Sequence, residues 1–106
     1  MVMLQKGENI LMQDPATSDD WGKGTLYLTS YRVVFETKTG LLAAKTELAM
    51  DYSLEKIQNV STHGLIGKKL RIELYAGERG TGGTHDFSVK NQAQWEQGIK
   101  SAVQSA

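Results

Sequence analysis

The stretch from Gly24 to Glu36 reads Gly-Thr-Leu-Tyr-Leu-Thr-Ser-Tyr-Arg-Val-Val-Phe-Glu and carries the clearest structural signal in the chain. Two runs of β-favouring residues, 25–28 and 32–35, flank a short polar break at Thr29-Ser30. In the first run, leucine alternates with threonine and tyrosine, which is typical of a strand with one buried face. We therefore predict a β-hairpin whose inner face carries Leu26 and Leu28.

The rest of the chain as far as residue 89 repeats this β pattern. A first strand is predicted over Glu8–Gln13. Asp14-Pro15 is expected to end this strand, and an exposed polar loop is expected to lead from there to residue 24. Lys69–Tyr75 shows the cleanest alternation, with apolar residues on one face and charged residues on the other. A strand with Leu48 and Met50 on one face is predicted over residues 47–54. Further strands are predicted over 60–62 and 84–89, with one helical turn at 54–57.

From residue 91 the apolar period changes to that of a helix. Asn91 is a good N-cap residue, with Gln94 three positions later as in a capping box. Gly98 weakens an isolated helix, so we expect close packing at that position. The apolar stripe of this helix consists of Trp95, Ile99, Ala102 and Val103. We predict a mainly β fold, in which one amphipathic C-terminal helix caps a seven-stranded, half-open antiparallel barrel.

Composition narrows the function classes. The chain has 106 residues, the size of one domain, and no cysteine, which excludes disulfides and thiolate metal sites. Lys plus Arg and Asp plus Glu both number 12, so no net charge attracts nucleic acid. No signal peptide or membrane span is visible, and we expect a cytoplasmic protein. The chain ends within a helical pattern, which is compatible with a domain cut from a longer protein.

Several segments resemble a known family. Gly24–Phe35 resembles the GRAM-type hairpin of the pleckstrin-homology-like (PH-like) superfold, and Gly7–Leu11 resembles the start of such domains. The polar-Leu-x-x-Ile pattern at Tyr52–Ile57 also resembles a pattern of that family. The chain is also similar to the GLUE domain of the ESCRT-II adaptor, in which a glycine-lysine turn, here Leu65–Lys68, precedes an alternating strand and a terminal helix.

This resemblance covers the whole chain in element order and implies a noncatalytic recognition module. GLUE domains bind phosphoinositide and ubiquitin, and other GRAM domains bind lipids or proteins. The implied role is that of an adaptor in membrane trafficking, located at membrane surfaces as a peripheral protein. The resemblance implies no cofactor.

Catalytic and metal-binding residues are not grouped in the sequence. The only histidines are His63 and His85, and His85 is followed directly by Asp86. Neighbouring residues on a strand point to opposite faces, so this pair does not form a catalytic dyad. Two distant histidines without an aligned pair of carboxylates make a poor metal site. We predict that the protein is not an enzyme and binds no metal.

An acid-free stretch between Lys56 and Ile72 is the best candidate for a ligand site. Its basic side chains are expected to hold an acidic phospholipid headgroup by charge-assisted hydrogen bonds. Leu65 and Ile66, at the tip of the turn, are expected to enter the acyl boundary beside it. The alternative is a solvated strand face balanced by Glu73. The candidate anion-binding residues are His63, Lys68, Lys69 and Arg71.

Two further features point to partner contacts. Trp21 either packs over one end of the barrel or is an exposed contact residue. Leu41 and Leu42 follow Gly40, and they either insert into a membrane or partner or fold onto the core. The protein partner implied by the resemblance is ubiquitin-like. The alternative function is a structural module that self-associates through Leu41-Leu42 and binds no lipid. The sequence leaves the oligomeric state open.

Overall fold

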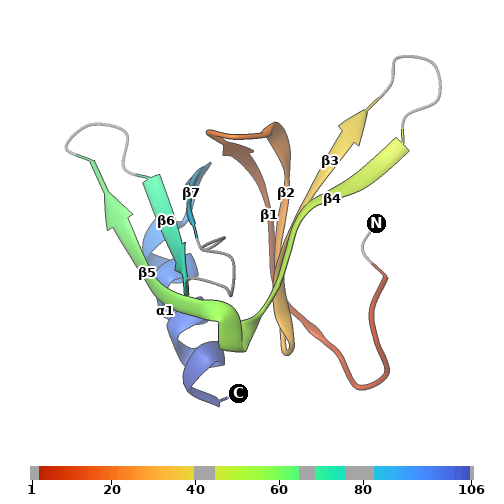
Figure 1. Cartoon of the computed structure of the whole chain (residues 1–106), viewed down its shortest axis with the longest axis vertical. Helices are drawn as coiled ribbons and strands as arrows, with labels where there is room; N and C mark the ends of the chain where they lie inside the picture. Colours follow the sequence, from red (N-terminus) through yellow and green to blue (C-terminus); the bar gives the residue numbers. More distant parts are fainter. Residues whose placement is uncertain (1–2, 40–44, 65–68, 76–82, 106) are drawn as a thin grey trace.

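The computed structural model describes residues 3–39, 45–64, 69–75 and 83–105. These residues form seven strands, one short 3-10 helix and one α-helix (Figure 1). In chain order the elements are β1 (Ile10–Ser18), β2 (Gly22–Thr29), β3 (Arg32–Thr39), β4 (Lys45–Ser53), η1 (Leu54–Lys56), β5 (Ile57–His63), β6 (Lys69–Leu74), β7 (Thr84–Val89) and α1 (Gln92–Ser105).

The strands form one antiparallel sheet in the order β4-β3-β2-β1-β7-β6-β5. β4 and β5 are consecutive in the chain, yet they lie at opposite ends of this order and are joined through η1. The sheet therefore curves without closing into a barrel. Figure 1 shows α1 packed beside β5 and β6, and the N-terminal segment on the side of β3 and β4. The predicted fold class, a mainly β fold of seven antiparallel strands with one C-terminal helix, is confirmed, and the strands form a half-open sheet.

The predicted hairpin is β2 and β3, and both of its faces are buried. Leu26 pairs with Phe35 on the inner face, and both side chains are buried in the main core. On the other face Tyr27 pairs with Val34, and these two are also buried. The chain N-terminal to β1 is held against this hairpin, since Ser30 N–H donates to the Asn9 carbonyl. Both strands of the hairpin are interior strands of the sheet, flanked by β4 and β1.

β1 runs through Asp14-Pro15, so the predicted strand break and long polar loop are wrong. The strand continues to Ser18, and the turn to β2 comprises residues 19–21. Pro15 pairs with Thr25 of β2, whereas the ladder to β7 begins only at Ala16. On its β7 side, β1 is thus an edge at Pro15, and an edge position tolerates a residue without an N–H.

A bulge in β4 changes the predicted alternation of that strand. Phe35 pairs with Met50 but Glu36 pairs with Leu48, so Ala49 is an extra residue on β4. A bulge reverses the side on which the following residues lie. Met50 is therefore buried while Leu48 is 45% exposed, although the sequence predicts both on one face.

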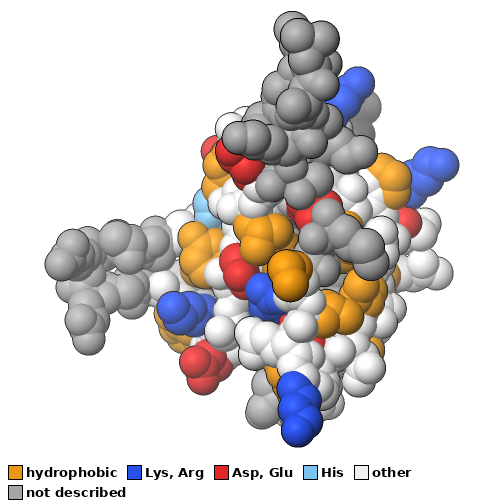
Figure 2. Space-filling model, turned by 90° about the vertical axis from the view of Figure 1, so that its right-hand side faces the viewer, with side chains coloured by type: hydrophobic (Ala, Val, Ile, Leu, Met, Phe, Trp, Pro, Cys, Tyr) orange, Lys and Arg blue, Asp and Glu red, His pale blue; other side chains and the backbone are white. Residues whose placement is uncertain are grey.

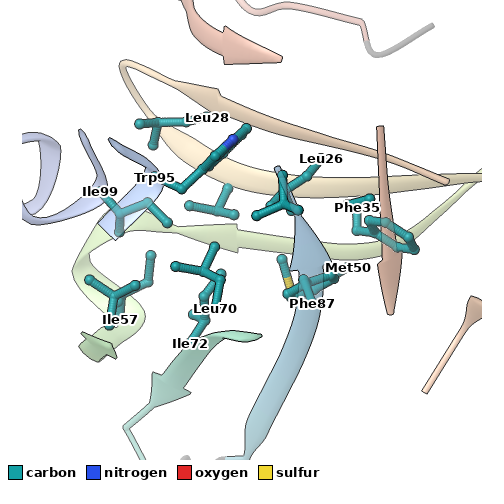
Figure 3. Packing of buried hydrophobic residues seen from close by; sticks show 14 of the residues in the cluster. Leu26, Leu28, Phe35, Met50, Ile57, Leu70, Ile72, Phe87, Trp95 and Ile99 are labelled. Carbon is teal, nitrogen blue, oxygen red and sulfur yellow. The ribbon is translucent and has the colours of Figure 1, made fainter. Parts of the chain in front are cut away.

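The core is closed by α1, whose Trp95 and Ile99 are fully buried (Figure 3). Trp95 Nε1 donates a hydrogen bond of 2.9 Å to Asp14 Oδ2, so the indole N–H is satisfied as well as buried. A Cβ added at Gly98 would lie 2.7 Å from Met12 Sδ, which confirms the expected close packing of this helix. Other core residues around these two side chains are Leu28, Ile57, Leu70 and Ile72.

A buried ion pair holds the N-terminal segment to the sheet. Arg32 Nε lies 2.8 Å from Glu8 Oε2, and the Glu8 side chain is fully buried. Thr29 Oγ1 donates to the same carboxylate, and Arg32 also pairs with Asp51 at 2.8 Å. Burial alone raises the pKa of Glu8, but hydrogen bonds from Arg32, Thr29 and the Gln5 amide outweigh it and lower the pKa to about 2.

Candidate functional site

The turn between β1 and β2 is built by Ser18 and fixed against β7. Ser18 Oγ accepts hydrogen bonds from the N–H groups of Asp20 (3.0 Å) and Trp21 (3.1 Å). The N–H of Asp19 donates to the carbonyl of Asp86 on β7 at 3.0 Å. A side-chain oxygen that accepts from the next backbone amides is a common turn device. Two acidic side chains and an indole are thereby held next to β6 and β7.

Three pairs of a basic side chain and a carboxylate, all of described residues, meet at this turn. Lys69 Nζ lies 2.6 Å from Asp19 Oδ1. Arg71 binds Asp86 with two hydrogen bonds, from Nε (2.9 Å) and from Nη2 (3.1 Å). His85 Nδ1 lies 2.9 Å from Asp20 Oδ2. We call this group the charged mouth; its members are Asp19, Asp20, Lys69, Arg71, His85 and Asp86.

Aromatic rings lie beside the charged mouth. The imidazole of His85 is stacked on Trp21, with ring centroids 4.9 Å apart, and on Tyr52 of β4, at 6.1 Å. Trp21 also stacks on Phe35 at 6.2 Å, yet 36% of its surface is exposed. Trp21 thus packs on the rings at this end of the core, and part of its indole remains exposed.

The electrostatics of the charged mouth are balanced. The hydrogen bonds from Arg71 lower the pKa of Asp86, although burial opposes this shift. Asp86 is thus a carboxylate at neutral pH, and its charge offsets that of Arg71. Acidic and basic side chains are also interspersed on the face of the molecule in Figure 2, without a large region of one sign. The acid-free stretch in the sequence is therefore not an acid-free region of the folded surface.

The structure brings together two of the four predicted anion-binding residues, Lys69 and Arg71. His63, at the end of β5, is the register partner of Lys69, and its Nε2 lies 2.8 Å from Ser61 Oγ. Lys68 lies outside the described residues, as do the predicted contact residues Leu65, Ile66, Leu41 and Leu42.

The predicted site did not include the carboxylates of the charged mouth. Asp86 is the cross-strand partner of Arg71 in the β6–β7 ladder. Both residues alternate with buried neighbours, so pairing the two predicted strands would have placed them side by side. Asp19 and Asp20 carried no comparable signal, because the predicted end of β1 at residue 13 left them in a loop without a position.

A hollow with a volume of about 460 Å³ lies between α1 and β1. Its apolar walls include Leu11, which is 54% exposed at the bulge of β1. Gly98 and the small residues after it on α1 form the other side. The lining residues are Leu11, Met12, Leu28, Ser30, Gly98, Ser101, Ala102 and Ser105.

The described residues show neither a metal site nor a membrane-spanning helix. The described residues contain no group of three or more His, Cys, Asp or Glu side chains placed to hold a metal ion. Within the same residues, no helix has the length and apolar character needed to cross a membrane.

No protein-family model matches the chain, and no curated protein matches it. Among solved structures, the chain is similar to a pleckstrin homology domain from Shewanella amazonensis SB2B. The two are 15% identical with a TM-score of 0.48, over 78% of this chain and 71% of that chain. A likeness of this degree says nothing about the ligand, and the architecture described above rests on the strand order and terminal helix of the chain itself.

Proposed function

We propose that this protein is a noncatalytic recognition module of the GRAM or GLUE type that binds an acidic phospholipid headgroup at the charged mouth. The observation that carries the proposal is the geometry of Arg71, whose guanidinium binds two oxygens of one anionic group at 2.9 and 3.1 Å. The same two-pronged arrangement is used to bind phosphate. Lys69 supplies a second cation from the same face of β6.

The surroundings of these cations support a site at a membrane surface. Trp21 has a partly exposed ring directly beside the charged mouth, and tryptophan favours the boundary between water and lipid. His63 adjoins Lys69 across the β5–β6 ladder. We include Lys68 as a further headgroup contact, and Leu65 and Ile66 as acyl contacts, from their place in the turn between these strands.

The test is sedimentation with phosphatidylcholine vesicles that contain phosphatidylserine or a phosphatidylinositol phosphate. Arg71→Gln and Lys69→Gln are each expected to weaken binding about fivefold, since a basic residue near an anionic surface contributes ~1 kcal/mol. Lys56→Gln is the matched control, because it removes the same charge from η1 at the other end of the molecule (Figure 1). Equal binding by all three variants and the wild type would contradict the proposal.

The hollow between α1 and β1 favours a second candidate, recognition of a protein partner such as ubiquitin. Its apolar lining and the exposed Leu11 are suited to accept an apolar side chain of a partner. Titration with ubiquitin, followed by NMR, is expected to shift the amides of Met12 and Ala102 and to do so less in Leu11→Ser. Leu48→Ser is the control, since it removes an equally exposed leucine on β4. Shifts confined to β4, or no shifts, would reject this candidate.

A further inference from the structure

In the free domain the cations of the charged mouth are already occupied by carboxylates of the chain itself. We propose that Asp19 and Asp86 are intramolecular competitors, which fill the positions of ligand oxygens in the free domain and are displaced when an anionic headgroup binds. This inference rests on the proposed function, because it concerns the regulation of the same site. The domain is, in this view, autoinhibited by its own side chains.

The geometry of Asp86 is that of a bound anion. Its two oxygens take up the Nε and Nη2 donors of Arg71, so no ligand can use this edge of the guanidinium while Asp86 remains in place. Asp19 Oδ1 takes up one of the three N–H donors of Lys69 at 2.6 Å, and it comes from a different element, the β1–β2 turn. Competitors therefore approach the two cations both from their neighbouring strand and from the turn.

The pairs are exposed enough to exchange. The side chains of Lys69 and Asp19 are 40% and 44% exposed, and those of Arg71 and Asp86 are 34% and 19% exposed. Exposed ion pairs stabilise a fold only slightly, so breaking them does not require unfolding. A ligand with a single negative charge gains little by replacing a carboxylate, whereas a phosphate monoester carries about −1.5 to −2 charges. The two carboxylates thus favour ligands that carry more than one negative charge.

Removal of a competitor is expected to strengthen binding to vesicles of phosphatidylcholine with a phosphatidylinositol phosphate. Asp86→Asn and Asp19→Asn keep the side-chain shape but remove the charge, and each should raise binding about fivefold or more. The control is Glu55→Gln on η1, which changes the net charge of the protein equally but lies away from the charged mouth. Circular dichroism and thermal melting establish that each variant is folded, and Asp19→Asn breaks only a half-exposed pair.

A double-mutant cycle separates competition from a simple gain of charge. If Asp86 acts by occupying Arg71, then Asp86→Asn has no effect on binding when Arg71→Gln is also present. Equal gains from Asp86→Asn, Asp19→Asn and Glu55→Gln would overturn the inference, as would an undiminished gain in the Arg71→Gln background. Weaker binding by Arg71→Gln with no gain from either asparagine variant rejects autoinhibition alone. If neither the wild type nor any variant binds these vesicles, the proposed function fails as well.

Discussion

At the scale of single residues, Gly24 shows how closely the strands approach one another. It is the first residue of the stretch that predicts the hairpin, and it lies within β2. A Cβ placed there would be 2.3 Å from the backbone carbonyl oxygen of Glu36 and 2.7 Å from the Phe35 ring. The carbonyl belongs to the neighbouring strand, which cannot move aside without disturbing the β2–β3 ladder. A glycine inside a strand often marks such an approach.

Gly24→Ala is therefore expected to lower the free energy of unfolding by about 1–3 kcal/mol, the usual cost of overpacking. Urea denaturation followed by circular dichroism measures this change. Gly83→Ala is the matched control, because the nearest atom to its added Cβ, His85 Nε2, is at an ordinary contact distance of 3.8 Å. A loss of stability in the control as large as in Gly24→Ala would show that the strand approach is not the cause.

At the scale of elements, α1 is attached to the sheet through its buried side chains, of which Trp95 is the largest. Trp95 is fully buried among residues of several strands and also donates to Asp14 on β1. A half-open sheet leaves its core uncovered at one end, and the helix supplies the missing apolar surface.

Trp95→Ala is expected to destabilise the protein by about 3–5 kcal/mol, the range for removing a large aromatic side chain from a core. Chemical denaturation provides the measurement. The control is Gln97→Ala, an exposed position on the same helix, which should change stability by less than ~0.5 kcal/mol. A small effect of Trp95→Ala would mean that the helix contributes little to the core.

Elements with a regular apolar period were predictable from the sequence, and irregular ones were not. The alternation in β6 and the apolar stripe in α1 correspond directly to buried faces in the structure. The prediction failed at Asp14-Pro15, because the local preference of proline says nothing about whether its strand has a neighbour there. It failed again at Leu48, because a bulge depends on how two strands pair and leaves no mark on one strand alone.

At the scale of the whole molecule, stability depends on carboxylates that must remain ionised. The pKa of Glu8 is lowered from 4.5 to about 2 in the folded protein. As the pH falls, Glu8 is therefore protonated at a higher pH in the unfolded chain than in the folded protein, so acid favours unfolding. The stabilisation is complete above pH ~4.5 and is lost between there and pH ~2, for a total of about 3 kcal/mol. Asp86, whose pKa is also lowered, acts in the same direction.

Urea denaturation at a series of pH values below neutrality is expected to show this decline. Glu8→Gln should be less stable than the wild type at neutral pH, because Arg32 loses its buried partner, and its stability should depend less on acid pH. The same acid dependence in both proteins would show that Glu8 is not responsible.

The candidate site also shows what a linear sequence conceals about charge. The stretch 56–72 contains no acid, and this led to the prediction of a basic surface. In the folded protein, Asp19 pairs with Lys69 and Asp86 pairs with Arg71. Both carboxylates belong to segments outside this stretch. The cations were predictable as a group, whereas their partners depended on which strands become neighbours.

The two tryptophans occupy contrasting positions, and this has a practical consequence for optical measurements. Trp95 is fully buried beneath α1, whereas Trp21 is partly exposed and stacked on His85 at the charged mouth. No third tryptophan is present in the chain. Replacing either one with phenylalanine leaves a single tryptophan, placed either at the mouth or in the core. Ligand capture and unfolding thus have separate fluorescent reporters within the protein, without an added dye.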